Sequence, residues 1–392
     1  MAPETLTLSP SSPGPAAEFS GLRNLYTATE PAKQVIRSNK PTETREPVVR
    51  PSIKFEPDRA DYEARSKRIL QNWSPDATLP DGYPGQISGQ RVWDGKTVGG
   101  VEAFALHLKP EEIEEIEDAL KQFKDLPGPN GPDQMARELF PLPTLGPKLE
   151  AISKDLHSGR GLTILRGLKP TKYTAKDNVL LFTGLASYIG EQRGCQDRYG
   201  NMLSQCEHRY PIKNIKLTDT IQAHLVDMGF KFGKDKPPVV WNARPILFPE
   251  TNHGPFFCFS RQKITGSEHY PLSTTLPAMS EEQAEALDMV HYVAEEHGIA
   301  MTLDPGDVLL YNNLAVLHGR NAFTDVETGD HRRHIMRLWV RNEEQAWETP
   351  AKLAREWHLV YGESERRAKA QWKINPEDVE KDRVIGHKMT CS

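Results

Sequence analysis

The stretch Leu303–Asn342 constrains the fold more than any other part of this 392-residue sequence. It opens on a proline–glycine pair, which predicts a turn, and Asp307–Asn312 then predicts a short strand. The polar loop Thr324–Asp330 reverses the chain. His334–Val340 alternates in side-chain type and predicts a return strand, because successive side chains of a strand point to opposite faces. The stretch therefore predicts two strands joined by a long polar loop.

Three side chains of this stretch are candidates for a functional site. His318 follows the first predicted strand, and Arg333 and Arg337 lie around the return strand. Each has a plainer interpretation. His318 alone is typical of a histidine hydrogen-bonded at a strand end, and Arg333 alone is typical of an arginine that pairs with a nearby surface carboxylate, which stabilises little.

The order of residues in this stretch resembles a known family. The pattern is G-D-x-x-x-x-N-N-x-x-x-x-H-x-R followed by R-R-x-x-x-R, and it is similar to the fungal branch of the taurine dioxygenase-like (TauD/TfdA-type) iron(II)- and 2-oxoglutarate-dependent oxygenases. The resemblance extends over about Arg160 to Pro350. Four upstream segments share it: Gly161–Gly167, Tyr188–Asn201, Phe259–Gly266 and Ser280–Gly298.

The resemblance implies a role for each candidate residue. His318 occupies the position of the distal histidine of an iron(II) site, for which a neutral imidazole is a suitable ligand. Arg333 occupies the position of the arginine that pairs with the far carboxylate of 2-oxoglutarate, and a guanidinium holds a carboxylate through two parallel hydrogen bonds. Arg337 is the second arginine, on the side of the substrate or of the co-substrate.

The sequence departs from the family at the other two iron ligands. These enzymes carry the first histidine and the carboxylate as H-x-D or H-x-E, well upstream of the distal histidine. None of the 13 histidines of this chain is followed two positions later by an acid. The sequence predicts that several dozen residues are absent between Arg209 and Thr218. It also predicts that Asp219–Phe230 is the helix that follows the absent segment.

Substitute ligands are few. On a helix, His224 and Asp227 would share a face at a spacing of three residues, although the plainer interpretation is a solvated helical turn. His208 stands directly beside Glu207, so the two side chains cannot easily reach one ion. His253 lies in an N-H-G-P sequence that is typical of a hairpin turn.

Periodicity predicts the remaining elements. The expected helices are Tyr62–Trp73, Pro110–Leu126, Leu149–His157, Thr174–Gln192, Ser280–His297 and Thr349–Lys373, and further short strands are expected at Leu162–Leu165, Phe256–Ser260 and Met301–Leu303. Thr174 is the expected N-cap of its helix. The pattern predicts an α+β fold, and with the resemblance it implies a double-stranded β-helix (jelly roll) core with surrounding helices, whose closure is in question because a strand is missing.

Three parts of the chain are expected from these elements. Residues 1–54 are rich in proline, serine, threonine and charge, and are expected to be disordered or loosely attached. Residues 55–350 are expected to form the taurine dioxygenase-like domain, and residues 351–392 a helical tail.

Composition limits the classes of partner. The net charge of −5 and the isoelectric point near 6.3 give no electrostatic case for nucleic acid or for an anionic membrane. No apolar run approaches the roughly 20 residues of a membrane-spanning helix, and the first residues do not resemble a secretory signal. The four cysteines are dispersed, as expected of free thiols in a reducing cytoplasm.

The sequence supports three hypotheses about function. The first is an oxygenase that uses iron(II) and 2-oxoglutarate to oxidise a small molecule, and the resemblance implies fungal secondary metabolism, including toxins, as its context. The second is a catalytically inactive family member that binds a ligand or partner. The third is an active enzyme of which this chain is an incomplete gene model. The sequence identifies neither the substrate nor the oligomeric state.

Overall fold

The computed structural model describes residues 53–72, 87–194, 222–224, 241–243, 247–248, 253, 256–265, 279, 281–319 and 335–362. The chain divides into two units, Met1–Glu46 and Pro47–Ser392, and every described residue belongs to the second unit. The expected N-terminal extension therefore lies almost wholly outside the described residues, as does the tail beyond Gly362. The predicted domain boundaries near residues 54 and 350 stay predictions.

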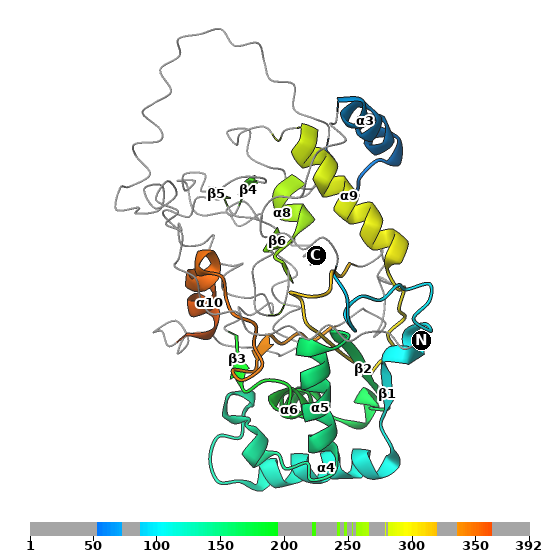
Figure 1. Ribbon diagram of the computed structural model, residues 1–392. Helices are drawn as coiled ribbons and strands as arrows, with labels where there is room; N and C mark the ends of the chain where they lie inside the picture. Colours follow the sequence, from blue (N-terminus) through cyan, green and yellow to red (C-terminus); the bar gives the residue numbers. More distant parts are fainter. Residues whose placement is uncertain are drawn as a thin grey trace, which may run out of the picture. The chain divides into compact units, whose positions relative to one another are not determined.

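The described part of the chain is a mixture of helices and short strands (Figure 1). The α-helices are α3 (Arg59–Asn72), α4 (Pro110–Asp125), α5 (Leu145–Ser158), α6 (Ala175–Ser187), α8 (Arg261–Thr265), α9 (Glu281–His297) and α10 (Ala354–Tyr361). The strands are β1 (Ala105–His107), β2 (Leu162–Arg166), β3 (Gln192–Arg193), β4 (Gln222–His224), β5 (Trp241–Ala243), β6 (Leu247–Phe248), β7 (Phe256–Phe257), β8 (Val308–Tyr311) and β9 (Val340–Arg341).

The largest described sheet has three strands in the order β1-β2-β8. Its central strand, β2, pairs in parallel with β1 and antiparallel with β8, so that Ile164 lies opposite Ala105 on one side and Leu309 on the other. Strands β3 and β9, β4 and β5, and β6 and β7 form three antiparallel pairs. These small sheets establish a mixed helix-and-sheet architecture, while the closed jelly roll stays a prediction.

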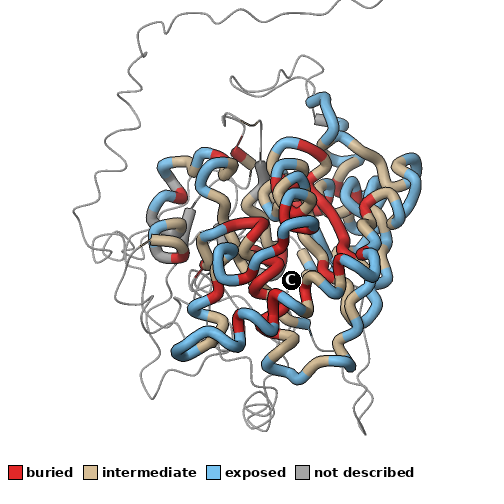
Figure 2. The backbone as a smooth tube through the Cα atoms, turned by 90° about the horizontal axis from the view of Figure 1, so that it is seen from below, coloured by how far each residue is buried: buried red, intermediate tan, exposed pale blue. Residues whose placement is uncertain are grey.

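Helices α4, α5 and α6 pack with the three-stranded sheet around one apolar core. Ile116, Phe123, Phe140 and Leu180 are at most 1% exposed in this core, and the buried residues run together through the interior (Figure 2). Each such side chain contributes about 1.5–3 kcal/mol when it is buried. The predicted helix is confirmed as α4, and its apolar residues at spacings of three and four face this core.

The predicted start of α6 is confirmed and its predicted end is wrong. The Thr174 hydroxyl accepts a hydrogen bond from the Asp177 N–H at 3.1 Å, as an N-cap does. The helix stops at Ser187 instead of reaching Gln192. A Cβ at Gly190 would lie within 3 Å of three backbone atoms of Arg341, so the chain must leave the helix and run as an extended strand beside β9.

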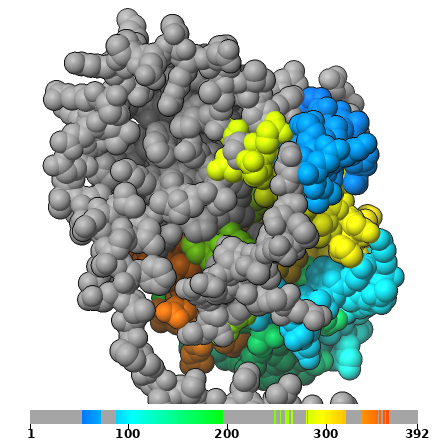
Figure 3. Space-filling view, turned by 45° about the horizontal axis from the view of Figure 1, so that its top comes forward, coloured from blue at the N-terminus to red at the C-terminus, as the bar shows by residue number. Residues whose placement is uncertain are grey.

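Helix α9 begins and ends close to the predicted residues. It buries Glu285, Asp288 and Tyr292 beside the apolar side chains of Ala284 and Leu287. The two carboxylates are buried because α3 brings Arg65 and Ser66 against them. Figure 3 shows α3, in blue, next to α9, in yellow.

Two other predicted elements differ from the structure. Met301–Leu303 is not a strand, and within the predicted helix Asp219–Phe230 the described residues Gln222–His224 form β4, paired with β5. His224 thus lies in a strand and not in a helix, so the argument that placed His224 and Asp227 on one helical face fails. Asp227 itself lies outside the described residues.

No helix in the described ranges is both long enough and apolar enough to cross a membrane.

Candidate functional site

The predicted strand in front of His318 is confirmed as β8, and a fixed turn places it. Gly306 has a φ of 101°, and a Cβ at this position would lie 2.0 Å from the carbonyl oxygen of Leu168. Only glycine fits there. The next residue, Asp307, forms an ion pair with Arg166 at 3.3 Å, which ties the start of β8 to the end of β2.

Asn312 shapes the turn between β8 and His318. Its backbone N–H donates to the Gly161 carbonyl at 2.9 Å, and its side-chain oxygen accepts from the Leu314 N–H at 3.0 Å. The carbonyl of Asn312 also accepts from the N–H groups of Ala315 and Val316. These bonds are the Asx-type turn that asparagine favours, and they direct the following residues back toward β8.

His318 lies against the last residue of β8. The Tyr311 hydroxyl and Nε2 of His318 are 3.2 Å apart and form a hydrogen bond, and the two ring centroids are 4.8 Å apart. Although part of His318 is exposed to solvent, the surrounding protein dehydrates the ring and lowers its pKa below the usual value, and the positive charge of Arg337 acts in the same direction. The imidazole is therefore neutral at neutral pH.

Of the two predicted arginines, the structure describes one. Arg333 lies outside the described residues. Arg337 is half-buried, acts electrostatically on His318, and lies over the Trp339 ring at 5.9 Å from its centroid. The predicted return strand is shorter than expected, because only Val340–Arg341 pairs as β9. The structure thus brings together His318, Tyr311 and Arg337.

An apolar cluster supports the loop that carries His318. Leu314 and Ala315, which precede the histidine, pack against the buried residues Phe248, Trp347 and Leu353. The described residue His253 lies in the connection between β6 and β7, as its turn sequence predicted, and its ring is stacked on Trp347 at 5.8 Å. The contact that the structure shows for His253 is thus a stacking contact with an aromatic ring.

Sequence reasoning missed the partners of Trp347. The Arg91 guanidinium lies 4.5 Å from the indole centroid, and the indole N–H donates to the His157 carbonyl at 2.8 Å. More than a hundred residues separate Trp347 from each of these partners, so no local spacing could have connected them.

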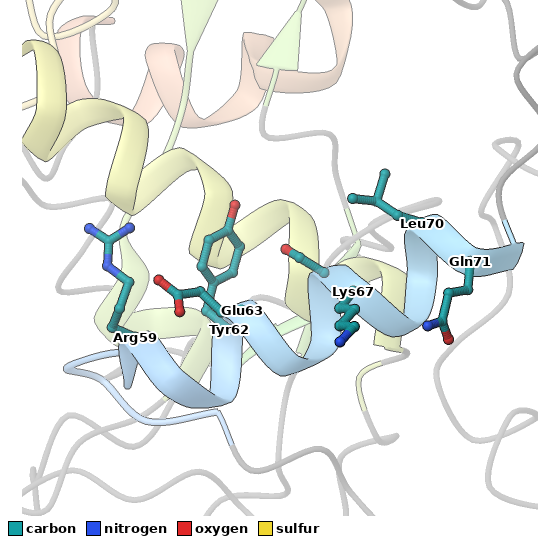
Figure 4. Close-up of a pocket in the computed structure, with 7 residues that line it drawn as sticks. Arg59, Tyr62, Glu63, Lys67, Leu70 and Gln71 are labelled. Atoms are coloured by element: carbon teal, nitrogen blue, oxygen red, sulfur yellow. The ribbon is translucent and has the colours of Figure 1, made fainter.

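A pocket among the described residues lies away from His318. It has a volume of about 700 Å³ and is lined by one flank of α3: Arg59, Tyr62, Glu63, Ser66, Lys67, Leu70 and Gln71. Figure 4 shows Tyr62 turned toward α9, where its ring meets that of Tyr292 at 4.8 Å. The lining contains none of the predicted site residues and mixes both signs of charge, so the candidate site remains the region around His318.

Comparisons with known proteins show which sequences this chain is similar to. Residues 234–339 match the sequence profile of the taurine catabolism dioxygenase TauD, TfdA family, a range that contains His318, Arg333 and Arg337. The chain carries a TauD/TfdA family domain. The match begins downstream of Arg209–Thr218, where the H-x-D pair was expected.

Two relatives contain similar sequences. The taurine hydroxylase-like protein SAT17 of Stachybotrys chartarum is 27% identical over 349 residues, covering 74% of this chain and 89% of that protein. The FR-33289 synthase of Streptomyces rubellomurinus is 37% identical over 73 residues, covering 18% of this chain and 21% of that protein. The 349 aligned positions exceed 74% of 392 residues, so several dozen positions of the Stachybotrys protein have no counterpart in this chain.

The described residues do not form the complete iron site that the TauD/TfdA resemblance implies. Within the described ranges, no three His, Cys, Asp or Glu side chains gather as metal ligands. In the whole sequence, no histidine is followed two positions later by an acid. His318 is thus a single candidate ligand, and Tyr311 already hydrogen-bonds its Nε2 atom.

Proposed function

We propose that this protein is an oxygenase of the iron(II)- and 2-oxoglutarate-dependent type that oxidises a small molecule in fungal secondary metabolism. The observation that carries the proposal is the ordered set of His318, Arg333 and Arg337 within the TauD/TfdA family match. The names of the two relatives, a hydroxylase-like protein and a synthase, support the same class of chemistry. With the family come a jelly-roll core and a cytoplasmic location as parts of the proposal.

The proposed roles suit the physical chemistry of the site. A neutral imidazole with a lowered pKa, as at His318, presents a lone pair to a metal ion. Arg333 and Arg337 are proposed to hold the carboxylate of 2-oxoglutarate or an acidic group of the substrate. Arg337 lies close enough for its positive charge to lower the pKa of His318. One histidine holds iron(II) weakly, so these roles require ligands that this chain does not supply in the family's form.

The missing iron ligands favour a second candidate function. A chain without the H-x-D pair can keep the apolar support around His318 and bind a small molecule without oxidising it. The missing pair and the unmatched positions in the alignment with the Stachybotrys protein support this candidate. The same observations support a third: the chain is a shortened form of an active enzyme.

An anaerobic titration with iron(II) and 2-oxoglutarate tests the proposal. The readout is the visible charge-transfer absorption of the chelate, measured in the chain as it stands, in His318→Ala and in Tyr311→Phe. A band that is lost in His318→Ala and kept in Tyr311→Phe supports an oxygenase with a substitute ligand set. Absence of the band in the folded chain means that this sequence alone is not an oxygenase, and the choice then lies between the second and third candidates.

A further inference from the structure

The paired strands β3 and β9 carry a second group of polar side chains on one face. Arg193 lies opposite Val340, Gln192 lies opposite Arg341, and the Gly194 N–H extends the ladder by donating to the Trp339 carbonyl at 2.7 Å. A Cβ at Gly194 would lie 3.2 Å from the Trp339 Cβ and 3.3 Å from Cε1 of Tyr361. The face that holds Trp339 is therefore the face that α10 covers.

Alternation places Arg341 on this same face, because side chains two residues apart in a strand point the same way. The intervening Val340 points the other way, into the main core. Arg193, its cross-strand neighbour, also turns away, and its guanidinium donates to the carbonyls of Pro132 and Asp133. Trp339 and Arg341 are thus neighbours on one face, close to the Tyr361 ring.

Two hydrogen-bond donors on this face have no acceptor among the described residues. Nε1 of Trp339 and Nε of Arg341 are both buried, and neither has a hydrogen-bond partner in the part of the chain that the structure describes. Within those ranges no carboxylate pairs with Arg341 either. Buried N–H groups are nearly always satisfied, and a buried guanidinium N–H is especially costly to leave without an acceptor. A negatively charged acceptor would therefore stabilise these two donors.

The surroundings favour an anion over a neutral acceptor. Burial raises the pKa of Tyr361 to about 12, with the charge of Arg341 opposing this rise, so the phenol stays neutral and does not compensate the arginine. On the other side, Arg337 lies over the Trp339 ring and adds a second positive charge. An acid group with two or three equivalent oxygens matches the geometry of a guanidinium edge beside an indole N–H.

We propose that Trp339 and Arg341 form a binding site for the acid group, carboxylate or sulfonate, of a small molecule. The indole N–H and the Nε edge of the guanidinium donate to its oxygens, and Arg337 continues the positive surface toward His318. The site goes beyond the proposed function, because it requires no iron and would be present in an inactive family member as well.

Nuclear magnetic resonance of the indole N–H groups in the metal-free full chain tests this site. Acetate, methanesulfonate and 2-oxoglutarate are the probes, and Trp339→Phe assigns the Trp339 signal. We expect the Trp339 signal to move with at least one probe, and the affinity to fall at least tenfold in Arg341→Met and less in Arg341→Lys, because lysine keeps the charge but not the fork. Arg68→Met is the matched control, since it removes the same charge from the surface of α3.

The outcomes separate this site from the oxygenase proposal. A response to 2-oxoglutarate alone identifies the co-substrate as the source of the acid group, and a response to acetate or methanesulfonate identifies a general acid-group site. If no probe moves the Trp339 signal, or if Arg341→Met and Arg68→Met change the affinity equally while both remain folded, the proposal is overturned. None of these results depends on iron, so a failed chelate titration leaves them unaffected.

Discussion

At the scale of single residues, Asp288 lies between two buried arginines. One carboxylate oxygen accepts from Arg65 at 2.8 Å and the other from Arg261, and all three side chains are at most 7% exposed. We expect Asp288→Ala to lower the free energy of unfolding by about 3–5 kcal/mol, because it removes the buried carboxylate that two buried guanidinium groups share. Urea denaturation measures the effect.

An exposed pair provides the control for Asp288. Glu296 pairs with Lys96 at 3.5 Å, and both side chains are 62% exposed. Glu296→Ala should therefore change the free energy of unfolding by less than about 1 kcal/mol. A loss at Asp288 as small as the loss at Glu296 would show that the buried network does not hold α3 and α8 to α9.

Gly306 is the second residue whose replacement has a defined consequence. Gly306→Ala places a Cβ in a left-handed backbone conformation and against the Leu168 carbonyl, so we expect a loss of about 3 kcal/mol or more. Gly89→Ala isolates the backbone part, because Gly89 has a φ of 106° but no atom within 4 Å of an added Cβ. It should cost about 1–2 kcal/mol. Equal thermal shifts in the two variants would contradict the clash at Leu168.

His157 makes stability depend on pH. Burial lowers the pKa of His157 below its usual value of 6.5, while the ring N–H donates to the Ser153 carbonyl at 2.7 Å. The unfolded chain takes up a proton near pH 6.5 and the folded chain only at lower pH, so the stability from the neutral ring is complete above pH 6.5 and is lost as the pH falls below it. We expect the free energy of unfolding to fall less between about pH 7 and pH 5 in His157→Gln. Identical slopes in the two proteins would refute this.

At the scale of elements, Tyr188 joins the end of α6 to the segment before α5. Its hydroxyl accepts from the Leu142 N–H and donates to the Phe140 carbonyl, each at 2.9 Å. Tyr188→Phe leaves both buried backbone groups without a partner, so it should cost about 1–3 kcal/mol in urea denaturation. Tyr173→Phe is the matched control, because its half-buried hydroxyl bonds to a Glu117 side chain that water can reach. A larger loss in Tyr173→Phe would contradict the role of Tyr188.

The elements also show what the sequence could predict. Local signals located α4 and the start of α6, because a helix period and an N-cap act within a few residues. Such signals could not show that α9 buries Asp288, since its partners Arg65 and Arg261 come from other helices. His318 and Arg337 belong to one continuous stretch, so the sequence could predict that they lie near each other. The surroundings of Trp339 and Arg341 depend on Gly194 and α10, which are distant in the sequence.

At the scale of the whole molecule, the candidate site is incomplete in one specific way. The TauD/TfdA match contains His318, the proposed distal ligand, and the H-x-D pair that the resemblance leads us to expect upstream is missing from the sequence. The alignment with the Stachybotrys protein contains several dozen positions that this chain lacks. A loss of that size would remove a strand as well as two ligands, and a core strand that is missing leaves neighbouring backbone groups without their ladder partners.

The third candidate, a shortened form of an active enzyme, predicts that the active protein is longer than this chain. We expect the transcript across Met202–Gly229 to encode additional residues that include H-x-D or H-x-E. The longer protein should give the iron(II)–2-oxoglutarate absorption band, because two histidines and a carboxylate hold iron(II) where one histidine does not. Sequencing the transcript is the first test, because it shows whether the additional residues exist. If it encodes Met202–Gly229 without additional residues, the incomplete gene model is excluded. The iron(II) titration then decides between a substitute ligand set and an inactive family member, in which binding at Trp339 and Arg341 becomes the function to measure.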